Sequence, residues 1–105
     1  MSRKAFITGA TSGIGEATAR LFAKHHIDLV LCGRRELRLE ALKAELSKMV
    51  QVKTLSFDVG NYAEAQKSIS GLEDNWRAID ILVNNAGGAH GLDLLTEGSV
   101  EDWKK

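Results

Sequence analysis

The stretch Thr8-Gly9-Ala10-Thr11-Ser12-Gly13-Ile14-Gly15 decides the fold of this chain. It follows a short apolar run at residues 5–7 that is typical of a strand, and it leads into a helical apolar spacing. The first-turn N–H groups of such a helix lack intrahelical partners and favour an anion, and glycines let a phosphate approach the backbone. The stretch therefore predicts a dinucleotide pyrophosphate site at residues 9–15. The alternative is a tight strand–helix turn that binds nothing.

Composition narrows the class of protein. The 105 residues are 44% hydrophobic and 27% charged, which is ordinary for one soluble globular domain. The 14 basic and 14 acidic residues cancel, so neither nucleic acid nor an anionic membrane is expected as a partner. No apolar run is long enough to span a bilayer and no signal peptide is evident. The single cysteine, Cys32, excludes an internal disulfide and suits the cytoplasm, and the three histidines show no metal-ligand spacing.

Strand and helix patterns alternate along the chain. Further strands are expected at 27–32, 52–57 and 79–83, further helices at 35–49 and 65–76, and a capping box at 99–102 opens a last helix. This order predicts an α/β fold, a doubly wound parallel sheet with strand order 3-2-1-4. The glycine turn and the sequence Asn84-Asn85-Ala86-Gly87 then meet at the carboxyl ends of the first and fourth strands, where such sheets bind ligands.

Each expected helix has a predicted apolar face. The apolar periodicity places these residues on one face of each helix: Ile14, Ala17, Thr18, Leu21 and Phe22 of the first helix, Leu39, Leu42, Leu46 and Met49 of the second, and Ala65, Ile69, Leu72 and Trp76 of the third. The second helix can also form the pairs Glu40–Lys43 and Glu45–Lys48 on its outer face. Gly71 is expected inside the third helix, at a cost of up to about 1 kcal/mol relative to alanine.

The end of the second strand favours NADP over NAD. An NAD site usually has a carboxylate there for the ribose 2′-OH, but this chain has Gly33 followed by Arg34 and Arg35. A glycine leaves room for a 2′-phosphate, and an arginine can bind it bidentately. The alternatives are that the arginines form a solvated loop pair, or that Glu36 reaches the ribose from a displaced position. Asp58 either caps a turn or helix or accepts a hydrogen bond from the adenine amino group.

Together these motifs resemble the cofactor half of the short-chain dehydrogenase/reductase family. The resemblance rests on Thr8-Gly9-xxx-Gly13-x-Gly15, Asp58-Val59 and Asn84-Asn85-Ala86-Gly87, which occur in order over essentially the whole chain. It implies a Rossmann-type domain and an NADP(H)-dependent oxidoreductase for a small alcohol or carbonyl substrate. The tract 33–35 and residues 99–103 further resemble the NADP-dependent 3-hydroxy acid dehydrogenase subgroup.

The resemblance also implies roles for individual residues. Gly9, Ser12, Gly13, Ile14 and Gly15 would line the pyrophosphate and ribose. The other cofactor contacts follow the sheet: Arg34 and Arg35 on the 2′-phosphate, Asp58 and Val59 on the adenine, and Asn84, Ala86 and Gly87 on the riboses. An asparagine of this last motif would also tie the fourth strand to the first turn.

No catalytic residue is assigned. The family uses an Asn, a Ser and a Tyr-x-x-x-Lys pair downstream of this motif, whereas the one tyrosine here, Tyr62, precedes it and has Gln66 four residues on. Residues 1–105 are thus expected to be an NAD(P)-binding domain truncated before the catalytic half, inactive alone and prone to self-association. The whole enzyme would be a homodimer or tetramer. The alternatives are a non-catalytic dinucleotide-binding module and a Rossmann-like domain with another ligand, such as a nucleotide sugar.

Overall fold

The chain folds around one four-stranded parallel sheet. The computed structural model describes residues 3–58, 60–76 and 78–85. The elements in chain order are β1 (Lys4–Thr8), α1 (Gly13–Lys24), β2 (Asp28–Gly33), α2 (Glu36–Leu46), β3 (Val52–Ser56), α3 (Tyr62–Ser70), the 3-10 turn η1 (Asp74–Trp76) and β4 (Ile81–Asn84). All strand pairs are parallel and the order is β3-β2-β1-β4, which confirms the predicted topology.

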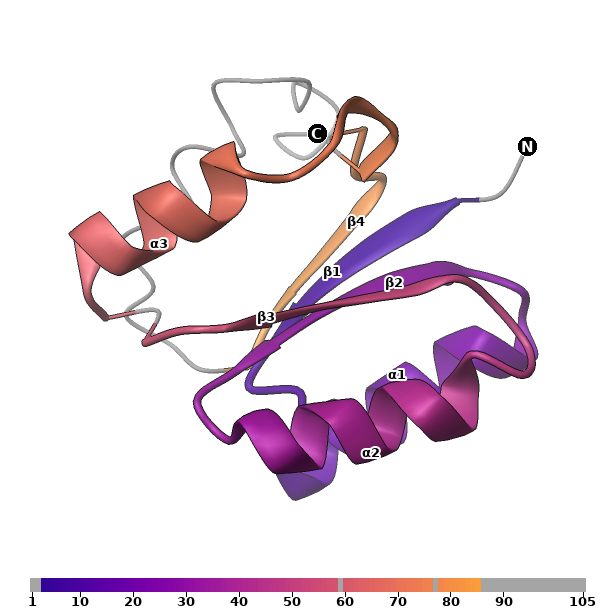
Figure 1. Cartoon of the computed structure of the whole chain (residues 1–105). Coiled ribbons are helices and arrows are strands. Elements are labelled where there is room, and N and C mark those ends of the chain that lie inside the picture. The colour runs from indigo at the N-terminus through magenta and orange to yellow at the C-terminus, as the bar shows by residue number, and fades with distance from the viewer. Residues whose placement is uncertain (1–2, 59, 77, 86–105) are drawn as a thin grey trace.

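The helices cover the two faces of the sheet unequally. Figure 1 shows α1 and α2 on one face and α3 on the other. Alternate strand residues point to opposite faces, so the sheet separates two apolar clusters. The cluster under α1 and α2 includes Ala5, Ile7, Leu29, Leu31, Leu39 and Leu46, and the cluster under α3 includes Phe6, Val30, Phe57, Ile69 and Trp76.

The predicted apolar face of α1 only partly coincides with its buried face, because Phe22 packs against the core while other members of that face are exposed. Ile14 is 74% exposed and Leu21 is 53% exposed, whereas the buried residues are Gly15, Ala19 and Ala23. These three recur every four residues and carry little or no side chain, so the helix can approach the sheet closely. Apolar periodicity therefore identified the helix but not the small residues that make its most deeply buried contacts.

The second and third helices also end earlier than predicted. In α2 the burial of Leu39, Leu42 and Leu46 is confirmed, but the helix stops at Leu46 and Met49 is exposed. In α3 the helix ends at Ser70 and Gly71 is its C-cap, donating its N–H to the Lys67 carbonyl at 3.2 Å. Trp76 still reaches the core, but through the 3-10 turn after this cap.

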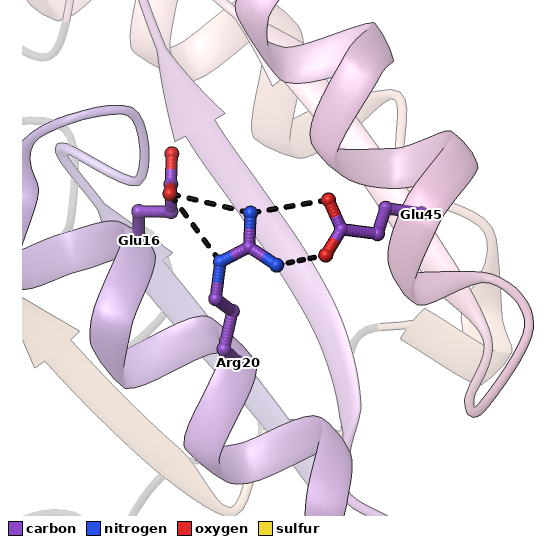
Figure 2. A network of polar contacts seen from close by, with 3 residues as sticks. All are labelled: Glu16, Arg20 and Glu45. Atoms are coloured by element: carbon purple, nitrogen blue, oxygen red, sulfur yellow. Dashed lines mark hydrogen bonds and ion pairs between the residues drawn. The ribbon is translucent and has the colours of Figure 1, made fainter.

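An ion-pair network joins the outer surfaces of α1 and α2. The Arg20 guanidinium donates to both Glu45 carboxylate oxygens on α2 and lies 3.3 Å from Glu16, one turn back on its own helix (Figure 2). Glu45 thus pairs with Arg20, and the predicted pairs Glu45–Lys48 and Glu40–Lys43 are absent from the described ion pairs. The hydrogen bond from Arg20 lowers the pKa of Glu45 and raises that of Arg20 itself.

None of the helices within the described ranges is long and apolar enough to cross a membrane.

Candidate functional site

The glycine turn connects β1 to α1 through a closed set of hydrogen bonds. Gly9 adopts a φ of 61°, the left-handed region that glycine occupies without strain. Its carbonyl accepts from the Ser12 N–H at 3.1 Å and from the Ser12 hydroxyl at 2.7 Å. The same hydroxyl caps α1 by accepting from the Gly15 N–H at 3.2 Å. The Ser12 hydroxyl therefore holds both Gly9, at the start of the turn, and Gly15, in the first turn of α1.

Two N–H groups at the start of α1 remain available. The N–H of Glu16 is bonded to the Ser12 carbonyl and that of Gly15 to the Ser12 hydroxyl. Those of Gly13 and Ile14 have no partner in the part of the chain that the structure describes. Both residues are exposed. With the positive end of the helix dipole behind them, these donors suit an anion.

Glycine is required at position 15 by the fold itself. A Cβ built on Gly15 would lie 2.0 Å from the Gly9 carbonyl oxygen, so α1 and the turn are in direct backbone contact. A Cβ on Gly13 would meet nothing within 4 Å. Packing therefore explains Gly15, whereas Gly13 borders open space beside the free N–H groups.

The carboxyl ends of β2 and β3 form a cleft of about 230 Å³. It is lined by Arg34, Ser56, Phe57, Asp58 and Glu64. Hydrogen bonds of 3.0 Å fix these strand ends: Cys32 O accepts from Ala10 N of the glycine turn, and Gly33 O accepts from Phe57 N, the residue after β3. Whole small-molecule sites usually occupy 300 Å³ or more, so the cleft suits one part of a larger ligand.

Arg34 is the cation of this cleft. Its guanidinium has no ion pair within the described residues. The preceding Gly33 is buried, but its glycine is not demanded by the fold, because a Cβ there would meet Leu39 and Thr11 side-chain atoms at an ordinary 3.6 Å. Arg35 is exposed, occupies the N-cap position of α2 and does not line the cleft.

Asp58 and Glu64 give the cleft its acceptors. Asp58 Oδ1 accepts from the Gly60 N–H at 2.9 Å, so this carboxylate holds a turn, as one of its two predicted roles requires. It also lines the cleft, where its second oxygen can serve a ligand. Glu64 is absent from the sequence-based site, although the spacing Asn61-x-x-Glu64 at a helix start is a capping signal that could have placed it here.

The ends of β1 and β4 are tied together at the other side of the turn. The Thr8 hydroxyl donates to Asn84 Oδ1 at 3.1 Å, and the two residues are register partners in the sheet. An asparagine of the fourth strand thus does hold that strand to the start of the glycine turn. Val59, Ala86 and Gly87, the remaining predicted cofactor residues, lie outside the described residues.

The described residues do not favour a thiol nucleophile or a metal site in this region. Burial raises the pKa of the Cys32 thiol well above its ordinary value, so the thiol is not a ready nucleophile. Within residues 3–85, gaps aside, no cluster of three His, Cys, Asp or Glu side chains could hold a metal ion. A hollow of about 260 Å³ between α1 and α2 is lined by Glu16, Arg20, Arg38 and Glu45, and both of these carboxylates are already paired with Arg20.

Comparisons with known proteins agree with this geometry. A family profile described as short chain dehydrogenase matches residues 3–105. The NADP-dependent 3-hydroxy acid dehydrogenase YdfG of Salmonella typhi is 46% identical over 98 residues, which cover 93% of this chain and 39% of that protein. Serine 3-dehydrogenase of Agrobacterium fabrum is 44% identical over 104 residues, covering 99% and 41%.

A solved structure extends the likeness to three dimensions. The closed form of serine dehydrogenase complexed with NADP+ superposes with a TM-score of 0.70 at 40% identity, over 80% of this chain and 33% of that one. The chain thus spans about two fifths of the length of the curated relatives it matches. Because the family profile covers nearly every residue and the sheet order, glycine turn and strand ends agree with it, the chain belongs to the short-chain dehydrogenase/reductase family.

Proposed function

We propose that this chain is the cofactor-binding half of an NADP(H)-dependent oxidoreductase that acts on a small alcohol or carbonyl substrate. The observation that carries the proposal is the Arg34 guanidinium, which lines the cleft and has no ion pair among the described residues. It follows Gly33, at the strand end where a carboxylate would select NAD. The names of both relatives and the NADP+ complex support the same cofactor.

Several described residues at the strand ends suit parts of this cofactor. Free N–H groups at Gly13 and Ile14 would hold the pyrophosphate, Arg34 the 2′-phosphate and Asp58 the adenine amino group. Asn84 sits at the strand end where the nicotinamide-side ribose would lie. When bound, NADP supplies the hydride acceptor or donor, and this half of the protein contributes binding and orientation. The proposed set also includes Gly9, Ser12, Gly15, Arg35, Val59, Ala86 and Gly87.

The substrate of the whole protein is proposed to be a small 3-hydroxy acid. The support is indirect, since the two relatives are named for 3-hydroxy acid and serine dehydrogenation. An assay of the protein extended to the length of these relatives, with L-serine and 3-hydroxybutyrate as substrates and NADP+ as oxidant, tests this choice. Oxidation of simple secondary alcohols alone would contradict it.

Cofactor preference is tested by two substitutions at the end of β2. Arg34→Ala should weaken NADPH binding about ten- to hundredfold and leave NADH nearly unchanged, because a charge-assisted contact contributes about 1.5–3 kcal/mol. Gly33→Asp should reverse the preference, because its carboxylate would repel the 2′-phosphate and accept from a ribose 2′-OH.

Gly33→Ala is the matched control, since it adds the same Cβ without the charge. Titration calorimetry gives the affinities of the unaltered chain and of the three variants for NADPH and for NADH. Equal binding of the two cofactors by the unaltered chain would refute the proposed preference.

A further inference from the structure

Glu64 holds a carboxylate at the wall of the cleft in a defined position. It is the third residue of α3 after the N-cap Asn61. Its backbone N–H donates to Asn61 Oδ1 at 3.2 Å, and its Oε2 accepts from Asn61 Nδ2 at 3.0 Å. This reciprocal cap restrains a side chain that would otherwise turn freely into solvent.

The cleft carries an excess of negative charge. Arg34 contributes one positive charge and Asp58 and Glu64 contribute two negative ones, so its formal charge is −1. A site built only for a phosphate would have no such carboxylates. Asp58 has a separate structural task in the turn at Gly60, whereas the cap formed by Glu64 needs an oxygen acceptor but not a charge.

We propose that Glu64 is a specificity-determining residue that limits how strongly the cleft favours a 2′-phosphorylated adenosine over an unphosphorylated one. The inference rests on the proposed function. Its carboxylate repels the added negative charge that Arg34 attracts, so the two side chains together set the preference for NADPH over NADH. Both side chains are exposed, so water screens the repulsion and the effect is modest.

Glu64→Gln removes the charge and keeps the cap, because a glutamine oxygen can still accept from Asn61 Nδ2. The full chain is titrated with adenosine 2′,5′-bisphosphate and with AMP, which differ at the 2′ position. Binding of the bisphosphate should tighten about two- to fivefold, the range of a single exposed charge interaction, and AMP should be unaffected. The gain should disappear near 1 M salt, where the screening length is about 3 Å.

Glu73→Gln is the control for net charge, because Glu73 pairs with Lys53, at the amino-terminal end of β3, and does not line the cleft. Three results would overturn the inference. Glu64→Gln could tighten binding no more than Glu73→Gln does, it could tighten the binding of both ligands equally, or it could leave the affinity for the bisphosphate unchanged. If Arg34→Ala abolishes the preference while Glu64→Gln leaves it unchanged, only the inference fails. If Arg34→Ala leaves the preference intact, the proposed function fails as well.

Discussion

The glycines of the first turn are present for three different physical reasons. Gly9 supplies a backbone conformation with positive φ, and Gly15 permits contact between α1 and the turn. Gly13 does neither, since it has an ordinary φ and open space around it. The glycine signature of this turn therefore combines two requirements of the fold with one requirement of the proposed ligand.

Alanine substitutions separate these requirements. Gly15→Ala should destabilise the chain by about 3 kcal/mol or more, because its Cβ overlaps a backbone oxygen that cannot move aside. Gly13→Ala should leave thermal stability unchanged or raise it slightly, because alanine favours a helix, and should weaken NADPH binding. Melting curves with and without NADPH measure both effects. Full NADPH affinity in Gly13→Ala would remove this residue from the proposed site.

At the scale of the element, α1 shows where sequence periodicity is informative and where it fails. The strands, their order and the presence of each described helix follow from alternation of apolar runs and turn residues. The face of α1 does not, because a periodicity analysis ranks Ile14 and Leu21 above Gly15 and Ala19. Close helix–sheet packing selects small residues, and their low hydrophobicity makes that selection difficult to see in a sequence.

The end of α1 contains a correctable strain. His26 has a φ of 61°, and the bonds from His26 N to Ala23 O and from Ile27 N to Phe22 O form a Schellman motif, in which glycine is preferred at this position. His26→Gly should stabilise the chain by about 0.5–1 kcal/mol and raise Tm by a few degrees, after the greater freedom of glycine in the unfolded state is counted.

The neighbouring His25→Gly is the control, because position 25 has a φ of −96° and gains nothing from glycine. Differential scanning calorimetry compares the Tm of the two variants with that of the unaltered chain. A lower Tm for His26→Gly would show that the imidazole contributes a contact of its own.

The link between α1 and α2 should depend on pH. The hydrogen bond from Arg20 lowers the pKa of Glu45, so the folded state favours the charged carboxylate. The stabilisation is therefore present at neutral pH and is lost as the pH falls below about 4.3, where an unperturbed glutamate takes up a proton.

Glu45→Gln should lower Tm at pH 7 and have a smaller effect at pH 3, and thermal melts at both values measure the difference. Glu40→Gln is the matched change on the same helix, because Glu40 accepts from Thr54 and has no ion pair within the described residues. Equal shifts at both pH values would contradict the assignment.

For the whole molecule, β4 is the least covered strand of the described sheet. Ile81, Leu82 and Val83 are only partly buried, although they pack against the two apolar clusters. In the described sheet β4 pairs with β1 on one side only. On α1, the helix over β1 and β2, Ile14 and Leu21 are exposed as well.

The isolated 105-residue chain is therefore expected to self-associate at low micromolar concentration. Sedimentation velocity over a range of concentrations measures this. Leu21→Glu distinguishes two routes, because it should weaken association through the helical face and leave pairing along the β4 edge unchanged. A monomer at every concentration would contradict the prediction.

The candidate site was predictable to the extent that it depends on strand ends. Gly9, Ser12, Arg34, Asp58 and Asn84 follow directly from the motifs, because the carboxyl ends of parallel strands must share an edge. Glu64 can be recognised in the sequence as a capping residue of the third helix, but that signal alone does not bring it beside Arg34, since its position depends on how the turn before α3 is closed. The difference between Arg34, which lines the cleft, and Arg35, which does not, is likewise set by three-dimensional geometry.

The backbone contact between Gly15 and Gly9 has a consequence for how the sequence of this turn can diverge in evolution. A descendant that keeps this fold is under pressure to keep Gly15, whether or not it still binds a dinucleotide, because any side chain at this position would strongly destabilise the fold. The fold does not require glycine at positions 13 and 33, because a Cβ is accommodated at both. Other residues could therefore replace these two glycines in a protein that no longer binds the ligand. In a set of related sequences, the loss of these two glycines with Gly15 unchanged would mark the proteins that no longer bind a dinucleotide.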